Sequence, residues 1–247
     1  MNNIKLETII NKKLNSFLYK DCIPNGLQIE GTEEVKKIVT GVTACQELLD
    51  IAVKEKAQAV IVHHGYFWNK NERTIKGIHR DRIKTILKND INLYCWHLPL
   101  DFHSTLGNNI QIGKILNVEL KGYISPLVPW GMLKRKVTEH EMINIITKKF
   151  NRIPFHYKVN ATQFIYKIAW CSGKGQGFID VVSQFGVDAF LTGEVSEETI
   201  HVVKEKNFHF FSIGHHASEC GGMIALTNWI KNKTNLDAIF FDIHNPI

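Results

Sequence analysis

The sequence of 247 residues lacks the features that mark several classes of protein. Its five cysteines are scattered and none belongs to a CxxC pair, which argues against a zinc ribbon and against a disulfide framework. No apolar run approaches the length of a membrane span, and the N-terminal segment MNNIKLETIINKKLN has no central apolar block of the kind found in signal peptides. We therefore expect a cytoplasmic protein that does not enter a membrane.

The net charge of +6 is not concentrated in any one segment. No segment resembles a basic arm or an RNA-binding motif, so nucleic-acid binding is not expected as the primary role, and a mild positive field suits a small anionic substrate. The loop SGKGQG at residues 172–177 does not fit the GxxxxGK[ST] pattern, which argues against a P-loop nucleotidase. Its N–H groups could bind an anion at the start of a helix, or its glycines could only permit close packing.

The chain contains an internal repeat. The segment that begins KIVTGVTACQELL at Lys37 aligns without a gap with the segment that begins KIAWCSGKGQGFI at Lys167. Few residues are identical, but the apolar positions coincide and both segments follow the pattern strand, turn, helix, strand. The similar segments IINKKLN and IITKKFN precede the two copies and predict an amphipathic helix before each. The repeat thus predicts parallel βαβ units in an α/β fold that arose by duplication.

The repeat also predicts the organisation of the chain. We place the boundary in the proline-containing connection SPLVPWG, so that the first α/β half covers residues 1–125 and the second covers residues 126–247. The connection has no low-complexity linker. We therefore expect the two halves to pack as one unit, with the metal site described next between them.

Histidines and acidic residues follow the ends of the predicted strands. His63 and His64 close the run AVIVHH, Asp101 follows LYCWHL, and His215 and Glu219 follow FFSIG. In open α/β sheets, ligands gather at the carboxyl ends of the strands. Three imidazoles and two carboxylates suit Fe, Zn, Mn or Ni and disfavour Mg or Ca. We therefore predict that these five residues bind metal.

The number of ligands favours two metal ions over one. Adjacent residues in a strand point in opposite directions, so a single ion is not expected to bind both His63 and His64 unless the strand has already ended. A carboxylate can bridge two ions about 3.5–4 Å apart, and Glu219 is longer than Asp101, which makes Glu219 the predicted bridge. A lone histidine at a strand end is more often a hydrogen-bonded surface or cap residue. The recurrence of the pattern at three strand ends favours the metal centre.

Other residues near these strand ends have several possible roles. His97 is the repeat counterpart of His215, and we expect it to hydrogen-bond a ligand carboxylate. Glu194 is the counterpart of His64 and is the candidate catalytic proton acceptor; alternatively, it is an acidic residue that favours the start of a helix. The aromatic run YFW at residues 66–68 could stack on a base, although such runs are more often core or interface.

Four motifs resemble those of a known family. They are IVHHG at residues 61–65, WHLPLD at residues 96–101, LTGE at residues 191–194 and GHHxxE at residues 214–219. Together they resemble the Nif-three-like family, whose members are often labelled GTP cyclohydrolase 1 type 2 homologues. The resemblance covers essentially the whole chain. It implies a three-layer α/β/α fold of two similar, intertwined halves, a dinuclear metal centre, and a homo-oligomer in the form of a toroidal hexamer.

By position, the resemblance implies one metal ion at His64, Asp101 and Glu219, and a second at His63, His215 and Glu219. Two divalent ions per subunit lower the pKa of a bound water and polarise a phosphoryl or carbonyl oxygen. We therefore expect hydrolysis of a small, nucleotide-like or damaged-nucleotide substrate. The alternatives are an iron pair with a redox role and a non-enzymatic ring scaffold. The cyclohydrolase label is a homology name and leaves the substrate open.

Overall fold

The structure is a computed structural model that describes residues 1–70, 74–157 and 163–247. The chain forms two compact units, each built around one β-sheet. Unit 1 contains Met1–Leu106 and Gly222–His244, and unit 2 contains Gly107–Gly221 and Asn245–Ile247. Among the described residues, no helix is long and apolar enough to cross a membrane.

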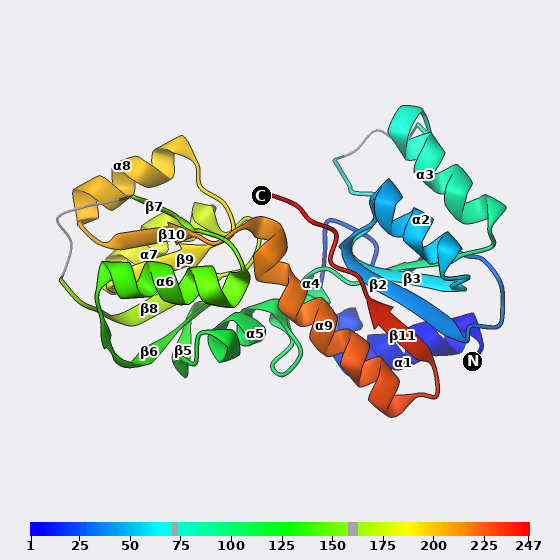
Figure 1. Cartoon of the computed structure of the whole chain (residues 1–247), viewed down its shortest axis with the longest axis horizontal. Helices are drawn as coiled ribbons and strands as arrows, with labels where there is room; N and C mark the ends of the chain where they lie inside the picture. The colour runs from blue at the N-terminus through cyan, green and yellow to red at the C-terminus, as the bar shows by residue number, and fades with distance from the viewer. Residues whose placement is uncertain (71–73, 158–162) are drawn as a thin grey trace. The chain divides into compact units, whose positions relative to one another are not determined.

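Unit 1 is a three-layer α/β/α structure. Its helices are α1 (Asn3–Leu14), the short 3-10 helix η1 (Ser16–Leu18), α2 (Gln46–Lys54), α3 (Gly77–Lys88), α4 (Leu98–Phe102) and the part of α9 (His215–Lys233) that begins at Gly222. Its strands are β1 (Gly26–Ile29), β2 (Lys37–Thr43), β3 (Ala59–His64), β4 (Asn92–Cys95) and β11 (Asp237–Phe240). Figure 1 shows α2 and α3 on one face of the sheet and α1 and α9 on the other.

The parallel strands β2, β3 and β4 of unit 1 are almost entirely buried, because helices cover both faces of the sheet. The strand order is β1-β4-β3-β2-β11, with β1 antiparallel to β4 and the other neighbours parallel. Val60 and Val62 pack with α2 and α3 on one face, and Ile61 between them is buried on the other face. The continuous apolar run AVIV before His63 is therefore the sequence signature of a strand buried on both sides.

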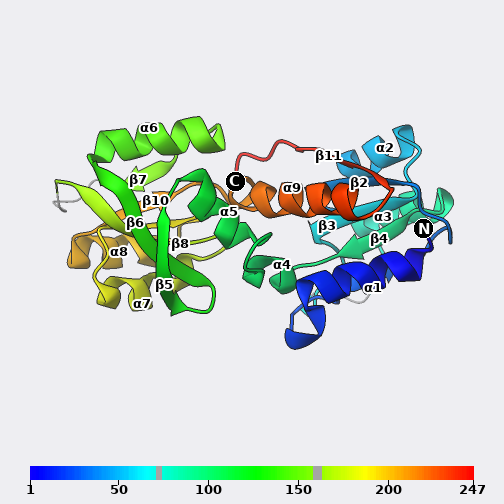
Figure 2. The same ribbon diagram turned by 90° about the horizontal axis from the view of Figure 1, so that it is seen from below.

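Unit 2 has the same layers. Its helices are α5 (Asn108–Ile115), α6 (Glu139–Phe150), the 3-10 helix η2 (Gln176–Phe178), α7 (Ile179–Phe185), α8 (Glu197–Lys206) and the first residues of α9. Its strands are β5 (Glu119–Ser125), β6 (Val128–Val137), β7 (Phe155–Tyr157), β8 (Ile165–Cys171), β9 (Ala189–Thr192) and β10 (His209–Ser212), in the order β5-β6-β8-β9-β10-β7. One buried cluster joins the sheet to α5 and α6, and another joins it to α7 and α8. Figure 2 shows α6 on one side of this sheet and α7 and α8 on the other.

The strand register confirms the internal duplication. Ile38 of β2 pairs with Ala59 of β3, and the residues 130 positions later, Ile168 of β8 and Ala189 of β9, pair in the same way. The next parallel strand is β4 in unit 1 and β10 in unit 2, and each is followed at the sheet edge by an antiparallel strand, β1 or β7. Both units therefore contain the βαβ arrangement that the repeat predicts.

The two halves of the duplication are intertwined because each contributes its last helix and strand to the other unit. The elements α5 and β5 follow the first copy in sequence but belong to unit 2. Most of α9 and all of β11 follow the second copy but belong to unit 1, where β11 pairs with β2. The boundary between residues 125 and 126 stays a prediction about where the two copies of the duplication meet. The compact units do not follow it, since unit 2 begins at Gly107.

One helix begins earlier than its sequence suggests. The glycines of GGMIALTNWI indicate a helix that starts after the acidic residue of the GHHxxE motif. In the structure α9 already begins at His215, directly after Gly214, whose φ of 95° is a conformation that side-chain-bearing residues rarely adopt. His215 and Glu219 therefore lie four residues apart, on one face of the helix.

The side chain of Asn92 connects several segments near one edge of the unit 1 sheet through hydrogen bonds. Its side chain is fully buried, and its Oδ1 accepts hydrogen bonds from the amide of Asn3 at 3.2 Å and the backbone N–H of Gly31 at 3.0 Å. Its Nδ2 donates to the carbonyl oxygens of Thr32 at 2.8 Å and Gln58 at 3.0 Å. A single amide thus satisfies four polar groups in and around the core.

We expect Asn92→Ala to lower the free energy of unfolding by about 3 kcal/mol, because it leaves buried donors and acceptors without partners. The measurement is urea unfolding followed by circular dichroism. Asn89→Ala is the control, since Asn89 is exposed and bonds one carbonyl of its own helix, and it should change the value by less than about 0.5 kcal/mol. Equal effects of the two substitutions would contradict this account of Asn92.

Candidate metal centre

The core of the candidate site in unit 1 is His63. This residue is completely buried near the end of β3, and its Nδ1 lies 2.9 Å from the carbonyl oxygen of Trp96. A carbonyl oxygen only accepts, so Nδ1 carries a proton, and Nε2 is the nitrogen that holds the lone pair whenever the ring is neutral. That Nε2 lies 3.6 Å from Oδ2 of Asp101, which is also buried. A nitrogen lone pair beside a carboxylate oxygen is a suitable pair of ligands for a divalent cation.

His64 lies next to this pair. Its Nδ1 is 3.2 Å from the hydroxyl of Thr43, and its ring centroid is 4.7 Å from that of His63. His63, His64 and His97 each offer a ring nitrogen within 4.8 Å of the other two. The alternation of side chains along a strand does not keep the two rings apart here, because His64 is the last residue of β3.

His97 is held by a carboxylate, although by that of a residue that the sequence motifs do not single out. Its Nδ1 lies 2.9 Å from Oδ1 of Asp21, and Oδ2 of Asp21 accepts from the side chain of Asn25 and the backbone N–H of Leu98. Burial raises the pKa of Asp21, but the hydrogen bonds from His97 and Asn25, together with the charge of His97, outweigh it and hold the pKa well below its usual value. His97 therefore bonds a carboxylate as expected, but that of Asp21 and not that of a predicted metal ligand.

The candidate residues of unit 2 lie at the start of α9. His215 Nε2 is 3.3 Å from Oε2 of the buried Glu219, and His215 Nδ1 is 2.7 Å from Oε1 of Glu194. Burial lowers the pKa of His215, but the hydrogen bonds and charges of Glu219 and Glu194 outweigh this effect and raise it to about 9. The two carboxylates thus create a position that stabilises positive charge at the imidazole.

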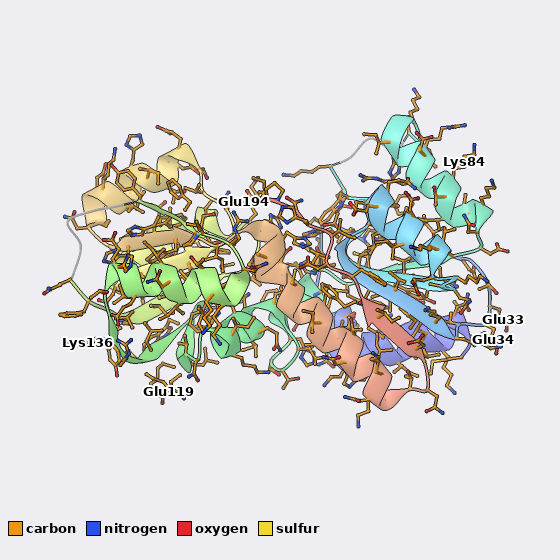
Figure 3. All side chains as sticks on the ribbon, viewed as in Figure 1. Glu33, Glu34, Lys84, Glu119, Lys136 and Glu194 are labelled. Atoms are coloured by element: carbon orange, nitrogen blue, oxygen red, sulfur yellow. The ribbon has the colours of Figure 1, made fainter. Side chains whose placement is uncertain are left out.

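Glu194 (labelled in Figure 3) lies between β9 and α8. It does not cap α8, because Ser196 is the N-cap of that helix and forms a capping box. Its two oxygens instead accept hydrogen bonds from His215 and from the side chain of Gln176. Burial alone would raise the pKa of Glu194, but the hydrogen bonds from His215 and Gln176 have the larger combined effect and lower it below its usual value. The carboxyl therefore stays ionised and acts as an acceptor.

Gly173 allows the backbone to approach the two ligand candidates of unit 2. Its φ is 60°, and a Cβ at this position would lie 2.2 Å from Oε1 of Glu219 and 3.2 Å from Nε2 of His215. Any side chain would therefore displace the carboxylate or the ring. The glycine leaves room around these two side chains.

The loop at residues 172–177 uses its N–H groups within the protein. The N–H of Gly173 donates to Ser218 Oγ at 2.8 Å, and that of Gly175 donates to Thr192 Oγ1 at 3.0 Å. A Cβ on Gly175 would also lie 2.6 Å from Thr192 Oγ1. Of the two interpretations of this loop, these contacts favour close packing over anion binding.

The aromatic run at residues 66–68 divides between core and site. Tyr66 is buried and donates its hydroxyl hydrogen to the carbonyl oxygen of Ala44. Trp68 is half-buried, with its ring centroid 5.1 Å from that of His97 and 6.0 Å from that of His64. The run therefore packs against the core through Tyr66 and borders the histidines through Trp68.

A family model described as Duf34/NIF3 (NGG1p interacting factor 3) matches residues 1–246. The chain belongs to this family. It is 62% identical over 247 residues to the "GTP cyclohydrolase 1 type 2 homolog" of Buchnera aphidicola subsp. Baizongia pistaciae, with full coverage of both chains. This membership confirms the resemblance that the four motifs indicate.

Solved structures of similar proteins share the Duf34/NIF3 fold. Within the family, the motifs VIVHHGYFW, WHLPLD and LTGEVSE resemble those of YbgI. The solved structure described as "Structural genomics, protein ybgI, unknown function" matches with a TM-score of 0.99 at 53% identity and covers all of both chains, which confirms this resemblance. TTHA1606 from Thermus thermophilus matches with a TM-score of 0.89 at 26% identity, again over all of both chains. The three-layer fold of two similar, intertwined halves is thus confirmed.

We expect Asp21→Asn to lower the free energy of unfolding on the order of 2 kcal/mol at pH 7. The folded protein disfavours protonation of Asp21, so this contribution is fully present above a pH of about 4 and is lost as the pH falls further. Urea unfolding of both proteins between pH 7 and pH 3 should show the difference shrinking at the acidic end. A difference that is constant over this range would show that the charge of Asp21 is not its cause.

Proposed function

We propose that this Duf34/NIF3 protein is a dinuclear metal-dependent hydrolase in which His63, His64, Asp101, His215 and Glu219 hold two divalent ions. One observation carries the proposal: both units contain the same arrangement of an imidazole and a buried carboxylate. His63 donates a hydrogen bond from Nδ1 to a carbonyl oxygen and presents Nε2 to Asp101. His215 has Glu194 at Nδ1 and presents Nε2 to Glu219. Metal-binding histidines usually have an oxygen acceptor at the second nitrogen.

The donor set fits a divalent transition ion. Imidazole nitrogens and carboxylate oxygens without thiolates suit Fe, Zn, Mn or Ni. Five side chains exceed the needs of one tetrahedral ion and suit two ions with open positions. As the sequence predicts, Glu219 is the bridging carboxylate of the proposed centre. The room that Gly173 leaves beside Oε1 of Glu219 supports this role.

The residues of the chain would divide the chemistry as follows. When bound, two divalent ions lower the pKa of a water molecule and polarise a phosphoryl or carbonyl oxygen of the substrate. Glu194 accepts a hydrogen bond from Nδ1–H of His215 and so keeps the proton on that nitrogen. Nε2, on the other side of the ring, is then the nitrogen that would bind the metal. That Glu194 accepts a proton during catalysis stays a prediction. Its two hydrogen bonds more directly support a role in positioning His215. Trp68 borders His64, with the two ring centroids 6.0 Å apart.

We further propose a small anionic, nucleotide-like substrate, a cytoplasmic location and a toroidal homohexamer. The net charge of +6 suits an anion, and the names of the curated relatives refer to a nucleotide enzyme. The hexamer follows from the family resemblance and is measured by light scattering. An iron pair with a redox role and a ring scaffold without catalysis are the alternatives that the next experiment separates.

Protein purified without added ions should contain at least two metal ions per chain and should hydrolyse a member of a panel of phosphoesters, modified nucleotides and cyclic amides. We expect Glu219→Gln to lose more than half of the metal and all measurable turnover, because the neutral amide cannot bridge two cations. The measurements are elemental analysis and product detection with each metal.

Glu198→Gln is the control, because Glu198 is an exposed carboxylate in the same unit and should keep both properties. Full metal content in Glu219→Gln would contradict the bridging role. No turnover by metal-loaded protein across the panel would contradict the hydrolase. Iron with an oxygen-dependent change in absorption would instead favour the redox alternative.

We expect Glu194→Gln to weaken metal binding roughly 10- to 100-fold without abolishing it, because an amide holds the Nδ1 proton of His215 less firmly than a carboxylate. Isothermal titration with Zn²⁺ measures the change. Glu197→Gln is a matched control: Glu197 bonds His201 at the same distance of 2.7 Å, but both side chains are exposed on α8. A loss of affinity in both variants would point to a general charge effect.

A further inference from the structure

A second group of metal-ligand residues lies in unit 2, in Glu139, His156 and His209. They come from three elements: Glu139 begins α6, His156 is the central residue of β7, and His209 begins β10. Each offers one ligand atom within 4.8 Å of the other two. None of them belongs to the motifs that define the candidate hydrolase centre.

The strand register explains why the two histidines meet. His156 pairs with Phe211 across the antiparallel ladder of β7 and β10, so both side chains lie on the same face. His209 precedes Phe211 by two residues and therefore shares this face. The face is the one that α6 covers, since Phe211 belongs to the buried cluster that contains residues of α6. Glu139 in the first turn of α6 completes the group.

The two imidazoles lie at the spacing that one ion requires, and Glu139 lies beside them. Nε2 of His156 is 3.2 Å from Nδ1 of His209, and two ligand atoms on a tetrahedral Zn²⁺ with bonds of about 2.0–2.1 Å are about 3.3 Å apart. Oε1 of Glu139 is 3.5 Å from the opposite nitrogen of His156, Nδ1, so the side chain of Glu139 has to turn toward Nε2 to join the same ion. The side chain of His156 is 6% exposed and that of Glu139 is 34% exposed, so the group is buried on the histidine side and open to solvent at the carboxylate.

The duplication supplies an internal comparison. The corresponding corner of unit 1 contains Asn3 at the start of α1 and Asn92 at the start of β4, and their amides form a buried hydrogen bond of 3.2 Å. The fold therefore needs a polar contact at this corner, and uncharged amides suffice. In unit 2 the same corner contains two imidazoles and a carboxylate, which are ligands that transition metals bind well.

We propose that Glu139, His156 and His209 form a separate site for one divalent transition ion of the zinc class. The ion takes the place of the proton between His156 and His209, which moves to Nδ1 of His156 or to solvent, and binds Nε2 of His156 and Nδ1 of His209. The partly exposed side chain of Glu139 turns away from Nδ1 of His156 to supply a carboxylate oxygen. Water from the exposed side completes a four-coordinate shell. Because β7, β10 and α6 are then joined through one ion, the site stabilises the edge of the sheet independently of the hydrolase centre.

The test uses the full chain with the hydrolase centre weakened by Asp101→Asn and Glu219→Gln. Isothermal titration with Zn²⁺ should detect one ion per chain, and adding His156→Phe should weaken this binding at least tenfold. Phenylalanine keeps an aromatic ring at this position, where His156 stacks on Phe211 with centroids 4.5 Å apart. His201→Phe is the control, since His201 forms an exposed pair with Glu197 in the same unit, and it should leave binding unchanged.

A second measurement does not depend on the weakened background. In the otherwise unchanged chain, His156→Phe and His156→Gln should each remove one bound Co²⁺ per chain from the absorption titration and should reduce the rise in melting temperature caused by Zn²⁺. Circular dichroism before metal addition verifies the fold of each variant. Equal metal binding with and without His156 would overturn the proposal and would show that the group is a hydrogen-bonded contact, as in unit 1.

Discussion

Burying a carboxylate costs free energy unless a cation or hydrogen-bond donors compensate its charge, and much of the candidate site follows from this constraint. Asp101 and Glu219 are both buried, and each has an imidazole nitrogen close to an oxygen. In unit 2 the consequence is visible in His215, whose pKa rises to about 9 because its proton supplies the missing positive charge. A divalent ion that replaces this proton compensates the same carboxylates more strongly, which links metal affinity to pH.

The histidines of the site are oriented by acceptors that lie outside the five proposed ligands. The carbonyl oxygen of Trp96 holds His63, Asp21 holds His97, and Glu194 holds His215. Two of these acceptors are carboxylates and one is a backbone carbonyl; they come from unrelated positions in the sequence, yet each fixes one ring nitrogen. This arrangement lets the protein set the direction of a lone pair without placing a charged residue at every ring.

The sequence predicts the parts of this structure that depend on local pattern. The run AVIVHH predicts β3 to the residue, and the repeat at Lys37 and Lys167 predicts two βαβ units whose strand registers agree. The motifs also predict the ligand candidates, because these follow the strand ends directly. Family membership, which the same motifs indicate, is confirmed.

Other features depend on contacts between distant residues and leave no local pattern. Asp21 meets His97 across 76 positions, and no spacing in a single sequence connects them. Gln176 binds Glu194 only because the loops after β8 and β9 lie side by side. The start of α9 at His215 is hidden by the glycines that follow it, which resemble a helix boundary. The side-chain contact between His156 and His209 depends on the register in which β7 pairs with β10, and β7 is too short to be predicted from the sequence.

Because the halves exchange their terminal elements, the sheet of unit 1 cannot be completed until the end of the chain has been synthesised. Ribosomes make the chain from the N-terminus, and domains generally fold as they emerge. The sheet of unit 1 receives β11 at Asp237–Phe240, beside the β2 strand made about two hundred residues earlier. During translation the nascent β2 therefore has one edge uncovered while all of unit 2 is synthesised. Until β11 arrives, the unpaired N–H and C=O groups of that edge are open to pairing with another chain.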